Sequence, residues 1–540
     1  MLDLATTVEA LPVGTPPLDH EMKKSSPWLG GVVVLAALIG GLGFISFHVA
    51  QDLGNITVSS NWHYLLLGAA LLIALGFEFV NGFHDTANAV ATVIYTNSLE
   101  PTIAVFWSGV CNLAGVLVST GTVAFAVVTL LPVELILHVG SSAGFAMVFA
   151  LLIAAILWNL STWWFGLPAS SSHTMVGSII GVGIANQLFS VHSGTSGVDW
   201  EQAIKILKVL LVSPLIGFAL AGLLILISKR LLKCPSLYES PKDNQPPPFP
   251  IRALMVLTCT GVSFFHGSND GQKGMGLIML ILIGTVPTAY ALNHTINPME
   301  IQEFLAASEQ AGHILDRHVD PNAVLMTNSQ TELTNYLRTR QMQPNTALAL
   351  RTLIGELNQE VVTYKDFKSI PAQDQTNVRN GLYLTSETIR LMQRNGNSSF
   401  TPAENTELKD FKSKIDKVTR FIPDWVKVAV ALALGLGTMV GWKRVVVTVG
   451  EKIGKEHLTY AQGAASGLVA MGSIFAADNF GLPVSTTHIL SSGVAGTMVA
   501  NGSGLRLSTV RNIAAGWVLT LPASALLSGL LFWLFRQFVA

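Results

Sequence analysis

Long stretches of apolar residues recur along the chain and are separated by short polar segments. A bilayer core about 30 Å thick requires roughly 20 apolar residues in a helix that crosses it. Stretches of this kind predict an all-α polytopic membrane protein with about 11 spans. The expected spans are 28–48, 63–94, 101–131, 143–163, 173–189, 203–228, 253–286, 422–441, 461–479, 488–501 and 512–535.

One segment departs from this apolar pattern. Between Glu300 and Lys427 the chain carries 31 of its 65 charged residues. Apolar residues recur there at helical spacing among polar ones, which predicts a small helical bundle in a water-soluble insert. Packed helices with solvated faces are favoured over a partner-binding module. The apolar positions include Leu350, Leu353, Ile354, Leu357 and Val361.

Two segments of the apolar body occur twice. Residues 165–173 and 480–488 share six of nine residues, and 79–88 aligns with 264–273 at Phe, Gly and Asp. Asp85 precedes His173 by 88 residues and Asp270 precedes His488 by 218, and the difference of 130 matches the insert. Each copy is expected to contain five spans. Because five is an odd number, the two copies must cross the bilayer in opposite directions. An inverted-topology repeat of broken helices is typical of secondary transporters, although channels show it too.

Basic residues in short loops predict the orientation of the chain, because such loops usually face the cytoplasm. Lys23 and Lys24 place the N-terminus inside, and Lys229 and Arg230 do the same for the middle loop. The insert and the C-terminus then lie outside, with Arg536 as a mild contradiction. The expected domains are an N-terminal tail with an extra transmembrane helix (1–62), a first repeat with a cytoplasmic linker (63–252), the start of the second repeat (253–295), a helical periplasmic insert (296–421) and the remainder of the second repeat (422–540).

Composition supports the membrane class and removes others. Only 12% of the residues are charged, half the share in soluble proteins, and the mean hydropathy is +0.49. The net charge of −1 argues against a nucleic-acid binder. Cys111, Cys234 and Cys259 form no CxxC pair, and no GxxxxGK[ST] motif for ATP is present. An enzyme is not expected.

The repeated Gly-Leu-Pro segments are candidates for anion binding. Pro168 and Pro483 end or restart a helix, and each is followed by hydroxyl residues that favour helix N-caps. Backbone N–H groups and hydroxyls at two such helix starts would form a nest of donors that suits a tetrahedral oxyanion. The alternative is that the hydroxyls only cap a broken helix. The residues concerned are Ser170, Ser171, Ser172, Ser485, Thr486 and Thr487.

Charged groups within the apolar spans are candidates for ion coupling. Asp85 and Asp270 lie where an uncompensated carboxylate is costly, so they are expected to bind Na⁺, relay a proton or cap a broken helix. Lys273, if buried, needs Asp270 or a bound anion as its partner, but it could instead extend to the membrane surface. His173 and His488 could donate to an oxyanion, take a proton or act as structural hydrogen-bonding groups.

These same motifs resemble the signatures of the inorganic phosphate transporter (Pit) family. The matching segments are 82–89, 166–173, 267–273 and 481–488. The amino-acid sequence of residues 79–95 is similar to that of the bacterial low-affinity branch. That branch is proton-coupled and is thought to carry phosphate as a neutral metal–phosphate complex. The resemblance implies an inverted-repeat transport domain that works by alternating access.

The resemblance also implies roles for individual residues. Coupling ions would lie at Asp85, Asn88, Asn269 and Asp270. Gln272 and Lys273 depart from the Ala-Asn of many members, so a Na⁺ site is in doubt there and a lysine charge could replace it. The implied phosphate ligands are Ser170, Ser171, Ser172, His173, Ser485, Thr486, Thr487 and His488, with Gln272 or Lys273.

The sequence therefore predicts a proton-coupled importer of inorganic phosphate in the bacterial inner membrane. A Na⁺-coupled symporter, an anion channel and a membrane-bound phosphate sensor are the alternatives. The expected partners are phosphate, H⁺ or Na⁺ and the lipid bilayer, without nucleic acid. No resident cofactor or metal is expected. A divalent metal carried with phosphate and a homo-oligomer are left open.

Overall fold

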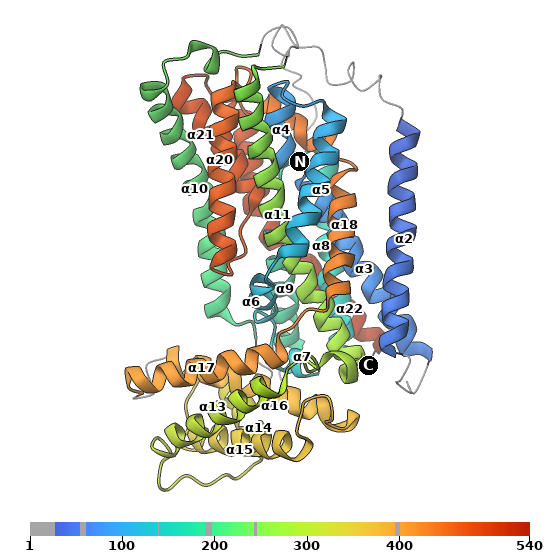
Figure 1. Cartoon of the computed structure of the whole chain (residues 1–540), viewed down its shortest axis with the longest axis vertical. Helices are drawn as coiled ribbons and strands as arrows, with labels where there is room; N and C mark the ends of the chain where they lie inside the picture. The colour runs from blue at the N-terminus through green and yellow to red at the C-terminus, as the bar shows by residue number, and fades with distance from the viewer. Residues whose placement is uncertain are drawn as a thin grey trace.

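The computed structural model describes residues 27–53, 61–138, 140–189, 197–241, 246–394 and 400–539. All regular elements within these ranges are helices, and Figure 1 shows most of them side by side in one upright bundle. Five further helices, α13 to α17, gather below one end of the bundle. Lys23 and Lys24 lie outside the described residues.

The apolar stretches do form helices, because every expected span overlaps at least one helix. Among the described residues, seven helices are long and apolar enough to cross a membrane, or up to eight if a bent pair, α17 and α18, counts as one span. The expected number of about 11 is not confirmed, since other helices of the bundle are shorter or more polar. These main helices are α2 (Pro27–Leu53), α3 (Asn61–Asp85), α4 (Ala87–Tyr95), α5 (Pro101–Val118), α6 (Thr122–Val128), α8 (Ser142–Trp164), α9 (Ser171–Phe189), α10 (Trp200–Leu231), α11 (Phe249–Thr285), α18 (Asp424–Thr438), α20 (Tyr460–Asn479), α21 (Thr486–Asn501) and α22 (Leu507–Val539).

Short helices connect these elements. They are α7 (Val133–Leu137), η2 (Pro235–Leu237), α12 (Pro287–Tyr290), α19 (Lys443–Val447) and η3 (Thr448–Lys452).

Two helical hairpins, α8–α9 and α20–α21, have tips of the same construction. At each tip a glycine adopts a left-handed conformation, Gly166 with φ +64° and Gly481 with φ +63°. The next residue closes the preceding helix: Leu167 N–H donates to Thr162 O and Leu482 N–H to Ala477 O, both at 2.9 Å. This is the Schellman ending that glycine favours. The repeated Phe-Gly-Leu-Pro sequence therefore produces a repeated local structure.

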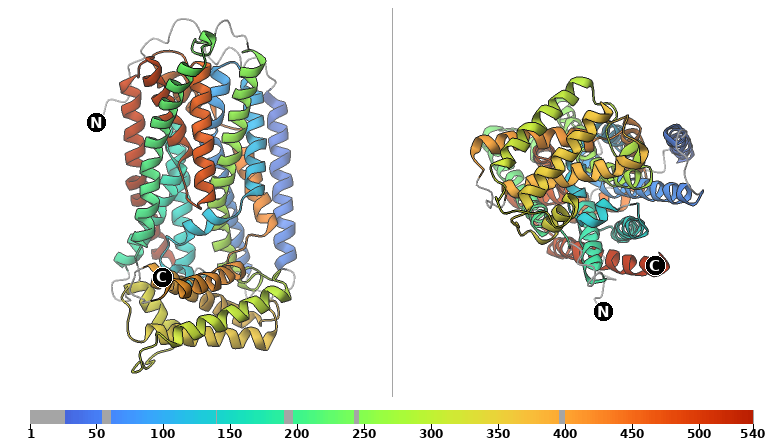
Figure 2. Two further views of the ribbon diagram at one scale, coloured as in Figure 1. Left: turned by 60° about the vertical axis from the view of Figure 1, so that its left-hand side comes forward. Right: turned by 90° about the horizontal axis from the view of Figure 1, so that it is seen from below.

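The second helices of the two hairpins run to opposite ends of the bundle. α9 ends before the segment that leads to the start of α10, beside the insert, whereas α21 ends at Asn501, whose carbonyl accepts from Lys229 at the other end of α10. Figure 2 shows α10 passing along the full height of the bundle. α9 packs on α22, and α21 packs in the same way on α10.

Glycines allow close contact between the helices that carry the two Asp motifs and their neighbours. A Cβ at Gly82 of α3 would lie 2.2 Å from Leu434 O of α18. A Cβ at Gly267 of α11 would lie 2.1 Å from Asn112 O of α5. Gly82 and Gly267 occupy matching positions in the repeated motif. Small residues are the usual means by which membrane helices approach closely.

The insert forms a compact helical unit, as its apolar spacing predicted. Leu350, Leu353, Ile354, Leu357 and Val361 are all buried in a core of its own. Its helices are α13 (Pro298–Asp316), α14 (Ser329–Thr339), α15 (Thr346–Tyr364), α16 (Ala372–Arg394) and α17 (Pro402–Thr419). The domain boundaries and the periplasmic location stay predictions.

Ion pairs attach the insert to the membrane body. Asp199, the N-cap of α10, accepts from Arg340 at 3.0 Å and from Arg390 at 3.2 Å. One helical turn after Arg390, Arg394 forms an ion pair with Glu201. Burial alone would raise the pKa of the Asp199 carboxyl, but the charges of Arg340 and Arg390 together outweigh it, and the pKa is lowered. These contacts fix the insert over the start of α10.

Candidate functional site

Asp85 is buried at the point where the first Asp motif interrupts a helix. It is the last residue of α3, and α4 begins two residues later. Thr86 stabilises the break because its hydroxyl donates to Gly82 O at 2.7 Å and to Thr438 O at 2.9 Å. The Asp85 carboxylate accepts from the hydroxyls of Ser171 and Thr487, both at 2.7 Å. These donors begin α9 and α21, so both hairpins meet at one carboxylate.

Asp270 and Lys273 lie in the middle of α11, which continues through the second Asp motif without a break. Lys273 is 1% exposed, its Nζ lies 2.7 Å from Asp270 Oδ1, and it also donates to the Ser172 hydroxyl. The expectation that a buried lysine pairs with Asp270 is confirmed, and extension to the membrane surface is excluded in this conformation. The ammonium joins the second acid to the first hairpin.

The hydroxyl runs cap the hairpin helices as expected. Ser170 Oγ accepts from the backbone N–H of His173, and Ser485 Oγ from that of His488, each at 3.2 Å. Ser171 also donates to Asp270, at 3.3 Å. The caps therefore leave the next hydroxyls free to serve the acids. Of the remaining hydroxyls, Ser172 donates to Val484 O at 2.7 Å, and Thr486 accepts from the Asn88 amide at 3.4 Å.

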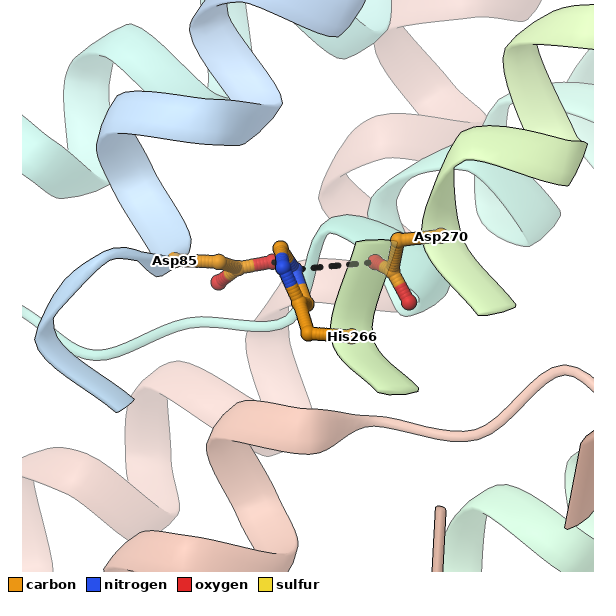
Figure 3. A group of neighbouring side chains, drawn as sticks. All are labelled: Asp85, His266 and Asp270. Atoms are coloured by element: carbon orange, nitrogen blue, oxygen red, sulfur yellow. Dashed lines mark ion pairs between the residues drawn. The ribbon is translucent and has the colours of Figure 1, made fainter. Parts of the chain in front are cut away.

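His266 completes a group of possible metal ligands that the predicted site did not include. Its Nδ1 lies 2.8 Å from the amide oxygen of Asn112, which can only accept, so Nδ1 carries the hydrogen. In the neutral imidazole, Nε2 then presents a lone pair. Nε2 lies 3.6 Å from Asp85 Oδ2 and 3.7 Å from Asp270 Oδ2. Figure 3 shows the imidazole between the two carboxylates, and the three ligand atoms lie within 4.8 Å of one another.

The amides expected at the site have different positions. Asn88 lies within it, 2.8 Å from the Thr487 hydroxyl and 3.5 Å from Asp85. Asn269 instead holds the second hairpin tip, donating to Leu482 O at 3.1 Å and accepting from Val484 N–H at 3.4 Å.

Gln272 makes its contacts away from the hydroxyls. It accepts from Val123 N–H at 2.9 Å and donates to Asp478 and to Ser268 O, each at 2.8 Å. These contacts join α11 to α6 and to the end of α20, and they use the donors that phosphate would need.

The rings of the two predicted histidines lie against each other at a tilt. The rings of His173 and His488 are 4.5 Å apart, and Trp517 covers His488 at 4.1 Å. His173 Nδ1 and His488 Nε2 have no hydrogen-bond partner among the described residues. Each histidine therefore has a ring nitrogen available for a ligand, and neither forms a hydrogen bond with Asp85 or Asp270 among the described residues.

Three residues that contact the candidate site are absent from the predicted set. They are His266, Asn112 and Asp478. Each was a polar residue inside an apolar range, which is the signal that could have found it. Their partners are distant in sequence, so spacing alone could not pair them.

The buried charges of the site do not balance. Glu78, Asp85 and Asp270 are three carboxyl groups, each at most 2% exposed, and Lys273 is the buried ammonium beside them. If all four are ionised, the site has a net charge of −2 before any anion binds. In that state an incoming anion would meet net negative charge.

Known proteins resemble this chain over most of its length. The profile described as "Phosphate transporter family" (PHO4) matches residues 81–528. The chain is 43% identical over 497 residues to the Escherichia coli K12 "Low-affinity inorganic phosphate transporter PitA", covering 88% of this chain and 97% of that protein. It is 40% identical over 495 residues to PitB of the same organism, with the same coverage. A solved structure, "The sodium-dependent phosphate transporter", is similar at a TM-score of 0.46 and 18% identity, over 88% of this chain and 99% of that one.

Proposed function

Since the chain belongs to the Phosphate transporter family, we propose that it is a multi-pass inner-membrane symporter that imports inorganic phosphate together with protons. The observation that carries this proposal is the meeting of two capped helix starts at the buried acids of the site. Ser171 and Thr487 bring hydroxyl donors from both hairpins to Asp85. Such donors suit phosphate oxygens as well as carboxylates.

In the proposed binding mode, phosphate takes over donors that the acids hold in its absence. The Lys273 ammonium would form a charge-assisted bond with the anion, and the N-terminal turns of α9 and α21 would add backbone N–H groups. Gln272 is the weakest candidate, because Asp478 and Val123 already occupy its amide. The proposed phosphate ligands are Ser170, Ser171, Ser172, His173, Ser485, Thr486, Thr487, His488 and Lys273.

Coupling to a cation follows from the charge of the site. Phosphate is an anion, and if Glu78, Asp85, Asp270 and Lys273 are all ionised, its entry into a site of net charge −2 is unfavourable unless protons or cations enter with it. Lys273 already neutralises Asp270, which favours protons over Na⁺ at the second acid motif. A Na⁺ ion at Asp85, Asn88, Asn269 and Asp270 is the alternative.

A metal–phosphate complex is a second form of the substrate that the geometry favours. Asp85, His266 and Asp270 offer two carboxylate oxygens and one imidazole nitrogen within 4.8 Å of one another. This set suits a divalent cation, which would arrive with phosphate as cargo and leave with it. The hydrogen bond from His266 Nδ1 to Asn112 orients the ring toward that position.

We also propose that the two repeats have inverted topology and transport by alternating access. Matching helices make matching contacts, since α9 packs on α22 as α21 packs on α10. Gly82 and Gly267 form equivalent close contacts in the two copies. Repeats of opposite orientation around a central site are the usual basis of rocking transport.

The experiment is phosphate accumulation by the purified full-length chain in vesicles. Labelled phosphate is supplied under an imposed pH gradient, Na⁺ gradient or neither. A proton symporter accumulates phosphate above equilibrium with the pH gradient alone. A channel would only equilibrate it, a sensor would bind without flux, and accumulation driven solely by Na⁺ would refute proton coupling.

A further inference from the structure

A third buried carboxyl group lies beside the site and takes no part in the binding geometry. Glu78 belongs to α3, about two helical turns before Asp85, and is completely buried. Its Oε1 has no hydrogen-bond partner among the described residues. Its Oε2 accepts only a long bond of 3.5 Å from the Asn81 amide.

The carboxyl group of Glu78 occupies a niche in α11 that exists because residue 274 is glycine. A Cβ at Gly274 would lie 2.3 Å from Glu78 Oε1 and 2.5 Å from its Cδ. Gly274 follows Lys273 in the chain. The free carboxyl oxygen therefore lies against the turn of helix that carries the ammonium of the site.

The charged groups that face Glu78 do not neutralise it. They are Asp270 and Lys273, both on α11. α8 and α4, which also pack on α3, have no charged residue, and α9 has only His173 as a group that can become charged. α18 has charged residues only in its first turn, Asp424 and Lys427. No basic nitrogen of the described residues forms an ion pair with Glu78, and Lys273 is engaged by Asp270.

The other two acids of the site differ from Glu78 in this respect. Asp85 accepts two hydroxyl bonds at 2.7 Å, and Asp270 has the Lys273 ammonium at 2.7 Å. Those contacts stabilise the ionised form of each carboxyl. The neutral donors near Glu78 are the distant Asn81 amide and the backbone N–H of Gly274, and neither is a short hydroxyl bond or an ammonium. Of the three acids, Glu78 is therefore the one whose neutral, protonated form fits its surroundings.

We infer that Glu78 carries the coupled proton, an inference that rests on the proposed proton symport. Glu78 takes up one proton as phosphate binds, so the closed site contains a neutral carboxyl at this position. The same proton leaves the same carboxyl when phosphate is released on the other side. The carboxylate so formed attracts the Lys273 ammonium and weakens its hold on the anion. One proton thus moves with each phosphate through Glu78, and the O–H bond of this carboxyl is the one covalent bond that forms and breaks in the proposed cycle.

Exchange and accumulation separate this role from a structural one. In vesicles of the full-length chain, Glu78→Gln fixes a neutral side chain of nearly the same shape. We expect this variant to retain exchange of labelled for unlabelled phosphate in the absence of a gradient. Its accumulation of phosphate under a pH gradient should fall about tenfold or more. Glu78→Asp keeps a titratable group and should recover part of the accumulation. Glu100→Gln, at the exposed N-cap of α5, is the matched control and should behave as wild type.

The outcomes are distinct. Accumulation by Glu78→Gln at the wild-type level would overturn the inference. So would joint loss of exchange and accumulation in a variant whose thermal unfolding matches wild type, because Glu78 would then serve binding rather than proton transfer. If the wild-type chain itself fails to accumulate phosphate under a pH gradient, the proposed proton symport fails first.

Discussion

The hydroxyl of Ser171 lies between two carboxylates and has a single hydrogen to offer. It is 2.7 Å from Asp85 and 3.3 Å from Asp270. An anion that binds at the start of α9 must take this donor from the acids. At the scale of one residue, substrate binding is therefore linked to the state of the carboxylates.

Removing these hydroxyls should weaken phosphate binding. Each hydrogen bond to a charged group contributes about 1.5–3 kcal/mol, part of which the remaining donors replace. We expect Ser171→Ala combined with Thr487→Ala to lower affinity by about 1–3 kcal/mol, roughly 5- to 150-fold. Equilibrium binding of labelled phosphate to the purified protein measures this. Unchanged affinity would move the anion site away from the helix starts.

Neutralising either aspartate should uncouple uptake. Asp85→Asn removes the acceptor that unites both hairpins, and Asp270→Asn leaves the buried Lys273 ammonium without its partner. We expect both variants to accumulate no phosphate above equilibrium in vesicles with a pH gradient. Asp316→Asn, on the exposed surface of the insert, is the control. Full-rate accumulation by both site variants would show that these carboxylates are structural.

At the scale of helices, Gly82 and Gly76 make a sharp contrast on α3. A Cβ at Gly82 would lie 2.2 Å from Leu434 O of α18, whereas a Cβ at Gly76 meets nothing within 4 Å. Gly82→Ala should therefore lower the free energy of unfolding by about 1–3 kcal/mol through overpacking. Gly76→Ala should leave it unchanged or raise it by up to about 1 kcal/mol, since alanine favours helix. Thermal unfolding in detergent compares the two, and equal effects would refute close α3–α18 packing.

Glu404 gives the insert a predictable acid sensitivity. It closes the capping box of α17, and the backbone N–H of Thr401 together with Arg317 lowers the pKa of its carboxyl to about 2. A lowered pKa in the folded state stabilises the fold above the ordinary value near 4.5, and this contribution is lost as the pH falls from about 4.5 toward 2.

Glu404→Gln should therefore be less stable than wild type at pH 7, with the difference shrinking as the pH falls through that range. Thermal unfolding of the full-length protein at several pH values measures the difference. Glu407→Gln, exposed on the same helix, should show no such trend. A constant difference between Glu404→Gln and wild type would contradict the assignment.

Local chemistry explains which elements could be predicted. Apolar length predicted the helices, and the hydroxyl after each proline predicted the caps at Ser170 and Ser485, since both depend on neighbouring residues. The contacts of Gln272 with Val123 and Asp478 are set by helices more than 100 residues apart in sequence, so no local pattern contains them. The break after Asp85 likewise depends on Thr438 of α18, and α11 has no equivalent break.

At the scale of the whole molecule, Cys234 provides a direct test of orientation. It is the exposed free cysteine, whereas Cys111 and Cys259 are buried. Its loop is expected in the cytoplasm and the insert outside. A membrane-impermeant maleimide on intact cells should label Met326→Cys, an 86% exposed position in the insert, in a Cys234→Ser background. Cys234 itself should react only after permeabilisation. The opposite labelling would reverse the predicted orientation.

The architecture was only partly predictable from the repeat. The matching segments form two hairpin tips of the same structure, in which Gly166 and Gly481 share one backbone conformation. The number of spans did not follow, since hairpin helices such as α21, with 16 residues, are shorter than a full crossing. Length rules assume that a helix traverses the bilayer, and hairpins that turn back within the bundle break that assumption.

The ion pairs between the insert and α10 have a mechanical consequence. The insert is part of the chain between α12 and α18, yet its arginines form ion pairs with Asp199 and Glu201 at the start of α10, which belongs to the other half of the sequence. The insert therefore connects the two halves of the molecule. If the two halves rock against each other as proposed, these ion pairs would have to shift or break. An antibody fragment bound to the insert would then restrain that motion without contacting the proposed phosphate site.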